Sequence, residues 1–165
     1  MREWWRPSVS ENIKATPWLS PEATAYFESI LKPEYSVCEF GGGGSTLWLQ
    51  SKVKSVYTCE PNTLWCDALN KLKANNVKIV NTRKPPVTSF DMFFIDGEPV
   101  EDRAHWINRA IQFVNKGGWI ILDNANRPEY ASEREKLQGE AIEYKTINAN
   151  KDGTQFLVTD FYRMP

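Results

Sequence analysis

The sequence has little of several features that mark other classes of protein. It contains one histidine, and its three cysteines have neither the spacing of a metal-ligand pair nor the number of a disulfide framework. No run of about 18 apolar residues occurs, and the first residues form no apolar signal-peptide core. We therefore expect a cytoplasmic protein that does not cross a membrane.

An excess of charge of one sign is also lacking. The 165 residues include 20 Lys and Arg against 21 Asp and Glu, a formal net charge of -1. Proteins that bind nucleic acid or anionic membranes mainly through phosphates carry clustered basic residues. We therefore expect neither kind of partner.

Hydrophobic residues make up 41% of the chain, which is enough to fill the core of one soluble domain. We expect that domain over residues 21–165, after an irregular arm at 1–20 rich in Trp and Pro. The tryptophans of the arm (Trp4, Trp5 and Trp18) either cover an open face of the core, form a lid over a binding site, or pack on a second subunit. A homodimer is therefore one expectation.

Strand and helix periodicities alternate along the chain. Ser20-Pro21 is typical of a helix start, and the apolar stripe after it predicts a helix that ends before Pro33. Strands are predicted at 37–40, 56–60, 77–80, 92–96, 119–122, 141–147 and 154–162. Helices are predicted at 46–52 with Ser45 as cap, 63–74, 100–115 and 129–138. This alternation, closed by a hairpin at Asp152-Gly153, predicts an α/β doubly wound, mostly parallel sheet.

Two of these helices have an apolar face that identifies their buried side. The residues expected to face the core are Leu64, Ala68 and Leu72 in the helix 63–74, and Ala104, Ile107, Ile111 and Val114 in the helix 100–115.

Four predicted strands end in an acidic residue: Glu39, Glu60, Asp96 and Asp123. Ligands of doubly wound sheets bind beyond the carboxyl ends of the strands, so these acids are expected to line one edge. Four consecutive glycines at 41–44 follow the first acid, where the backbone can approach a ligand closely. Glu60 comes about 20 residues after this turn, where an acid accepts both hydroxyls of a ribose. The pattern predicts a nucleotide-type site.

The segments with these residues resemble the class I S-adenosylmethionine-dependent methyltransferases. Residues 37–46 (VCEFGGGGST) and 56–62 (VYTCEPN) are similar to motifs I and II of that superfamily. Residues 93–97 and 117–124 are similar to the later strands of its small O-methyltransferase-like members.

The resemblance covers about residues 20–161. It implies a Rossmann-like, seven-stranded sheet with an antiparallel last strand. It also implies S-adenosylmethionine as cofactor and methyl transfer to a small molecule, with a hydroxyl as the first choice of acceptor. The implied cofactor-binding residues are Glu39, Phe40, Gly41, Gly43, Ser45, Thr46, Glu60, Asn62 and Asp96.

A magnesium site is a second implication of the resemblance. In catechol-type O-methyltransferases, an Asp after the fourth strand and an Asp-Asn pair after the fifth hold Mg²⁺, and Asp96, Asp123 and Asn124 match these positions. Oxygen ligands of this kind suit Mg²⁺, which would lower the pKa of an acceptor hydroxyl. The alternative is structural: Asp96-Gly97 forms a turn, and Asp123-Asn124 caps the next helix.

Asp96 and His105 are the candidate catalytic residues. Asp96 is placed to meet the cofactor amine or the acceptor, and His105 has the pKa of a general base, although a surface or packing role explains it as well. Arg127 follows Asp123-Asn124 and is placed to pair with an anionic substrate. Two other functions stay open: a non-catalytic or partner-dependent S-adenosylmethionine-binding module, and an NAD-dependent enzyme, which the glycine spacing disfavours.

Overall fold

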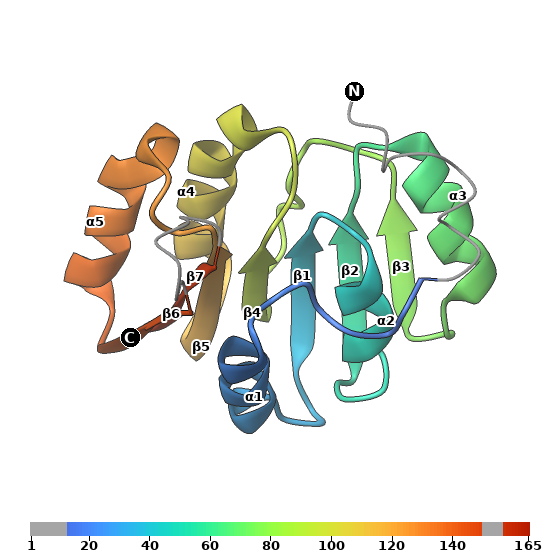
Figure 1. Ribbon diagram of the computed structural model, residues 1–165, viewed down its shortest axis with the longest axis horizontal. Helices are drawn as coiled ribbons and strands as arrows, with labels where there is room; N and C mark the ends of the chain where they lie inside the picture. The colour runs from blue at the N-terminus through green and yellow to red at the C-terminus, as the bar shows by residue number, and fades with distance from the viewer. Residues whose placement is uncertain (1–12, 150–156) are drawn as a thin grey trace.

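The computed structural model describes residues 13–149 and 157–165. Seven strands form one sheet in the order β3-β2-β1-β4-β5-β7-β6 (Figure 1). The neighbours from β3 to β5 are parallel, whereas β7 is antiparallel to both β5 and β6. The strands are β1 Ser36–Phe40, β2 Ser55–Cys59, β3 Val77–Val80, β4 Phe90–Ile95, β5 Val114–Asp123, β6 Glu143–Asn148 and β7 Val158–Arg163. The predicted doubly wound, mostly parallel sheet with an antiparallel last strand is confirmed.

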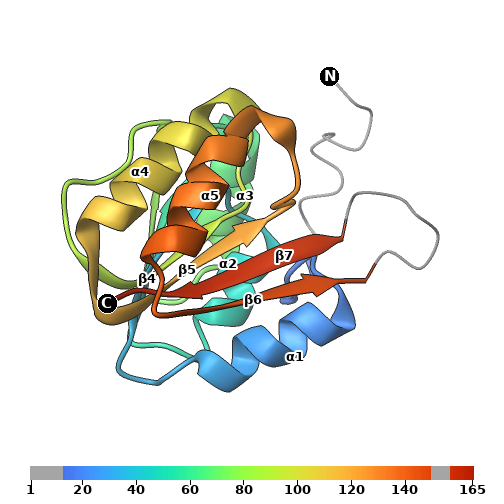
Figure 2. The same cartoon turned by 90° about the vertical axis from the view of Figure 1, so that its left-hand side faces the viewer.

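Helices cover both faces of the sheet. They are α1 Pro21–Ile30, α2 Gly44–Leu49, α3 Thr63–Leu72, α4 Arg103–Phe113 and α5 Ala131–Glu140, with 3₁₀ turns at Val100–Asp102 and Pro128–Tyr130. Figure 2 shows α4 and α5 on one face and α1 on the other. Ser20 caps α1 as predicted, since its hydroxyl accepts the N–H of Ala23 at 3.1 Å.

Aromatic side chains fill both cores because successive residues of a buried strand point to opposite faces. Phe93 of β4 packs with Phe40 on the α4 side, where Phe40 also stacks on Trp106 at 5.1 Å between ring centroids. Phe94, the next residue, packs against Phe27 of α1 on the other side. This continuous apolar strand places the residues that follow it, from Asp96 onward, at the centre of the carboxyl edge.

The glycine pair at 117–118 lies inside β5, although the predicted strand starts only after it. β5 begins at Val114 rather than at residue 119. A Cβ on Gly118 would lie 2.4 Å from the carbonyl oxygen of Asp91, so only glycine permits the close approach of this strand to the start of β4.

The buried faces of two helices also differ from the predicted ones. In α4 the buried residues are Arg103, Trp106, Ile107 and Ala110. In α3 they are Cys66, Ala68 and Leu69, whereas Leu64 and Leu72 are exposed by 49% and 42%. Ile107 and Ala68 were predicted correctly, but each buried face is rotated about the helix axis. The apolar stripe was ambiguous because cysteine and the aliphatic stem of arginine also pack in cores.

The connection from β3 to β4 is short and contains no helix over its described residues, 81–89. Trp4, Trp5 and the hairpin signal Asp152-Gly153 lie outside the described residues. In the part of the chain that is described, no helix combines the length and the apolar character that a bilayer crossing needs.

Candidate functional site

The glycine turn at 41–44 joins β1 to α2 at the carboxyl edge of the sheet. Gly41 has a φ of 91°, and a Cβ there would lie 2.5 Å from the Cα of Gly97, so the turns after β1 and β4 touch through their backbones. A Cβ on Gly43 would meet no described atom within 4 Å. The turn is therefore tight on one side and, as far as the described residues go, has space beside it on another.

The first described residues lie against the same turn. A Cβ on Gly44 would come within 2.4 Å of the carbonyl oxygens of both Lys14 and Thr16. Trp18, which follows, is 68% exposed. Part of the predicted N-terminal arm is therefore next to the glycine turn.

Glu60 binds the glycine turn directly. Its Oε2 accepts the N–H of Gly42 at 2.7 Å, and its Oε1 accepts the N–H of Asn62 at 2.8 Å. The side chain of Asn62 caps α3 by accepting the N–H of Trp65 at 3.1 Å. Burial raises the pKa of Glu60, and the two backbone hydrogen bonds oppose that rise. One carboxylate thus holds the ends of β1 and β2 and the start of α3 in a fixed arrangement.

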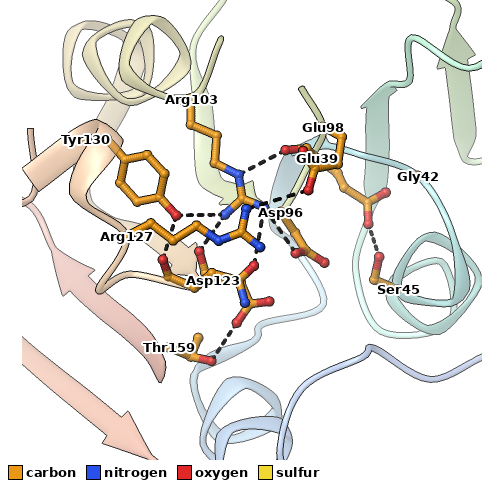
Figure 3. Close-up of polar contacts among 12 residues, drawn as sticks. Glu39, Gly42, Ser45, Asp96, Glu98, Arg103, Asp123, Arg127, Tyr130 and Thr159 are labelled. Carbon is orange, nitrogen blue, oxygen red and sulfur yellow. Dashed lines mark hydrogen bonds and ion pairs between the residues drawn. The ribbon is translucent and has the colours of Figure 1, made fainter. Parts of the chain in front are cut away.

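Glu39 is completely buried among hydroxyl groups. It accepts hydrogen bonds from Ser45, from Thr46 at 2.6 Å and from Thr58 at 2.9 Å (Figure 3 shows Ser45 beside it). Burial raises the pKa of Glu39 to about 7, although these three hydroxyls lower it. Ser45 is therefore not the helix cap that the sequence predicted: α2 begins after Gly43, and the Ser45 hydroxyl donates to Glu39 instead.

Asp96 and Asp123 approach each other at the ends of β4 and β5 (Figure 3). The two carboxyl groups are close enough for each to affect the pKa of the other. Burial raises the pKa of both, and the charge of Asp123 raises that of Asp96 further. The Asp96 side chain remains 26% exposed, whereas Asp123 is 6% exposed and accepts a hydrogen bond from Thr159 at 3.0 Å. Asp96 is the member of the pair that a ligand can reach.

Arg103 of α4 lies behind this pair and is 1% exposed. It donates to the carbonyl oxygens of Gly97 at 2.9 Å and Asp123 at 2.6 Å, and its Nη2 lies 3.4 Å from Oδ1 of Asn124. The same Nη2 lies 3.7 Å from Oδ1 of Asp96. The sequence did not predict the burial of Arg103, because pairing with an anionic substrate and a solvated helix face explain an arginine at this position equally well. The spacing i, i+3, i+4, i+7 places Arg103 on the same helix face as Trp106, Ile107 and Ala110. This spacing could have predicted that Arg103 is buried.

The three residues predicted to hold Mg²⁺ are therefore brought together, but with a guanidinium among them. In the described ranges no group of three His, Cys, Asp or Glu side chains is arranged to hold a metal ion. Asn124, which has a positive φ of 50°, presents its amide oxygen to Arg103. This donor set does not fit a metal while Arg103 is in place, so the magnesium site stays a prediction and no step is derived through it.

The other predicted residues have varied positions. Phe40 is fully buried, and its ring lies between those of Phe93 and Trp106. His105 is exposed on α4, and residues two apart on a helix point in nearly opposite directions, so it faces away from the side of Arg103. Arg127 lies at the rim, 28% exposed and 3.6 Å from Glu98 (Figure 3).

No family model matches the sequence, and no curated protein matches it. Solved structures match the fold. The tRNA (m1A58) methyltransferase TrmI from Aquifex aeolicus is 16% identical, with a TM-score of 0.70 over 92% of this chain and 72% of that one. The precorrin-6y C5,15-methyltransferase from Geobacter metallireducens GS-15 is 16% identical, with a TM-score of 0.62 over 86% of each chain.

A third match is the N-methyltransferase NodS from Bradyrhizobium japonicum WM9 in complex with S-adenosyl-L-homocysteine. It is 12% identical, with a TM-score of 0.59 over 80% of this chain and 79% of that one. The chain therefore has the fold of the class I S-adenosylmethionine-dependent methyltransferases. One of these neighbours is named for tRNA and another for a precorrin, so the fold leaves the class of acceptor open.

Proposed function

We propose that the chain is an S-adenosylmethionine-dependent methyltransferase with a small-molecule acceptor, most simply a hydroxyl. The observation that carries this proposal is the hydrogen bond between the glycine turn and Glu60 at the ends of two adjacent parallel strands. Each Glu60 oxygen accepts one backbone N–H and retains a lone pair for a ribose hydroxyl. The space beside Gly43 lets the cofactor approach the backbone.

The strand order supports this cofactor over NAD. In the dinucleotide-binding sheet the strands follow the order 3-2-1-4-5-6. Here β7 enters between β5 and β6 and runs antiparallel to both. An antiparallel last strand is what the methyltransferase resemblance implies.

The proposed reaction breaks the bond between sulfur and the methyl carbon and forms one between the acceptor oxygen and that carbon, leaving S-adenosylhomocysteine. Because the sulfonium is already an activated donor, alignment accounts for most of the catalysis. Asp96 contacts the cofactor amine or the acceptor, since it is the partly exposed acid of the edge. The acceptor proton leaves to solvent, because His105, the candidate base from the sequence, faces away from the side of Arg103.

Charge supports a small acceptor over a nucleic acid. The segment that follows Asp96 presents two exposed acids, Glu98 and Glu101, whose side chains are exposed by 50% and 73%. Phosphate groups bind where Lys and Arg gather, and these acids would repel them. Arg127 and Arg83 lie near the same segment, but both are paired with its acids.

Calorimetric titration with S-adenosylhomocysteine and with NAD tests the cofactor. We expect S-adenosylhomocysteine to bind, and NAD to bind at least tenfold more weakly. Glu60→Gln should weaken the binding of S-adenosylhomocysteine by about tenfold, because the ribose loses a charged hydrogen-bond acceptor. Glu140→Gln, an exposed acid on α5, is the matched control. Binding of NAD alone would contradict the proposal.

Transfer of tritium from S-[methyl-³H]adenosylmethionine tests the acceptor. Sugars, phenols and other small hydroxyl compounds are compared with total tRNA and rRNA under the same conditions. Label in a small compound supports the proposal, and label in RNA contradicts the acceptor class. Cofactor binding with no transfer to any of them would favour a binding module.

A further inference from the structure

Arg103 has the surroundings of a bound cation rather than of a surface arginine. Four oxygen atoms at the ends of β4 and β5 lie within 3.7 Å of its guanidinium: the carbonyl oxygens of Gly97 and Asp123, Oδ1 of Asn124 and Oδ1 of Asp96. The Tyr130 hydroxyl is a fifth neighbour, 3.2 Å from Nη1, and itself donates to the carbonyl of Asn124 at 2.5 Å. Figure 3 shows Asp96, Asp123 and Tyr130 around the guanidinium.

We propose that Arg103 is the resident cation of this site: it holds the oxygens at the ends of β4 and β5 in position and leaves them unable to bind a divalent metal. Arg103 is in this view a positioning residue. The idea that these oxygens serve methyl transfer rests on the proposed function. The competition between Arg103 and a metal for the same oxygens does not rest on it.

Charge and geometry make the two cations mutually exclusive. A guanidinium cannot be deprotonated in a protein, so its positive charge persists at every pH at which the chain folds. Mg²⁺ needs its oxygen ligands at about 2.0–2.1 Å, in a nearly octahedral arrangement. A divalent ion bound to Asp96 and Asn124 would lie against Nη2, and the repulsion would act in a buried region where screening is weak.

The same contacts explain why the arginine is held there. A buried charge is strongly unfavourable unless it is paired and hydrogen-bonded. Arg103 meets that condition by joining the loop after β4, through Gly97, to the end of β5, through Asp123. Asp96 therefore keeps a fixed position at the edge with no metal to orient it.

Titration with Mn²⁺, followed by the paramagnetic resonance signal of the free ion, tests the proposal. We expect no site tighter than about 1 mM in the wild-type protein. Arg103→Met keeps the apolar stem and removes the charge, and it should bind one Mn²⁺ at least about tenfold more tightly. The double variant R103M/D96N should lose that site. A role in folding alone would predict none of these changes.

Several results would overturn the proposal. One is a tight, stoichiometric Mn²⁺ site in the wild-type protein that Asp96→Asn abolishes. Another is a folded R103M, judged by circular dichroism, that binds Mn²⁺ no better than the wild type. If R103M does not fold, R103K preserves the charge and should bind Mn²⁺ as weakly as the wild type; tight binding by R103K would contradict exclusion by charge.

Calorimetry with S-adenosylhomocysteine on the same samples separates this inference from the proposed function. Failure of the wild type to bind that compound counts against the proposed function and leaves the Mn²⁺ result unaffected.

Discussion

The backbone N–H of Gly42 donates a 2.7 Å hydrogen bond to Oε2 of Glu60, which joins the glycine turn after β1 to the acid after β2. The two sequence motifs therefore form one structural unit before any ligand arrives. Glu60 has two tasks in this account: it holds the turn, and it receives the ribose. Its substitution should affect the protein both with and without ligand.

We expect Glu60→Ala to lower the free energy of unfolding by about 2 kcal/mol in the absence of ligand, because it leaves two backbone N–H groups without their acceptor. Those groups belong to Gly42 and Asn62. Urea denaturation at pH 7 measures the change. An unchanged midpoint would mean that water replaces the carboxylate and that the turn keeps its shape independently.

Gly41→Ala should be strongly destabilising and should abolish binding of S-adenosylhomocysteine. The φ of 91° is strained for alanine, and the new Cβ would lie 2.5 Å from the Cα of Gly97, where backbone must move. Gly139→Ala is the matched control: a Cβ in this exposed position of α5 meets nothing described within 4 Å. The control should gain about 0.5–1 kcal/mol of stability. Equal effects of the two substitutions would contradict the close contact of the turns.

The pH dependence of stability should include a contribution from Glu39. Its folded-state pKa is raised to about 7, chiefly by burial, so folding favours the protonated form. The stabilisation from Glu39 is fully present below about pH 4.3, the ordinary pKa of glutamate. It is lost as the pH rises through the folded-state pKa of about 7. The free energy of unfolding of the wild type, relative to Glu39→Gln, should fall by up to about 3 kcal/mol over this range. Chemical denaturation of both proteins from pH 4 to 8 measures the difference, and a difference that stays constant or rises with pH would contradict the assignment.

A second buried acid provides a stability test away from the site. Asp160 of β7 is fully buried and accepts hydrogen bonds from Arg134 at 2.7 and 3.1 Å, from Thr146 at 2.7 Å and from Tyr162. Arg134→Met removes the cation that forms an ion pair with this acid and should lower the free energy of unfolding by about 2 kcal/mol.

Lys136→Met, an exposed substitution on the same helix, controls for the loss of one positive charge from α5. It should change the free energy of unfolding by less than about 0.5 kcal/mol. If the two variants unfold at the same urea concentration, the ion pair of Arg134 with Asp160 contributes no net stability.

The sequence was sufficient for the centre of the sheet because four of its strands combine apolar residues with an acid near the carboxyl end. β3 was predicted with its observed bounds. Glu39 is the next-to-last residue of β1, Asp123 is the last residue of β5, and Glu60 and Asp96 directly follow β2 and β4. The glycine turn was also recognised, because four glycines between a strand and a helix leave few alternatives.

The sequence was insufficient wherever a polar side chain turned inward. Arg103 and Thr58 lie in segments whose apolar residues define the buried face, and their burial depends on partners more than 15 positions away in the sequence, Asp123 and Glu39. Such pairs are set by the packing of neighbouring strands, which no local pattern encodes. The β5 start was missed for a similar reason, since Gly118 is required by its contact with Asp91.

A crystal structure of the protein with S-adenosylhomocysteine tests the central claim most directly. The account predicts that both ribose hydroxyls lie within hydrogen-bonding distance of Glu60, that the ligand passes beside Gly43, and that Arg103 keeps its contacts with Gly97 and Asp123. A ligand bound elsewhere, or a ribose without contact to Glu60, would contradict it.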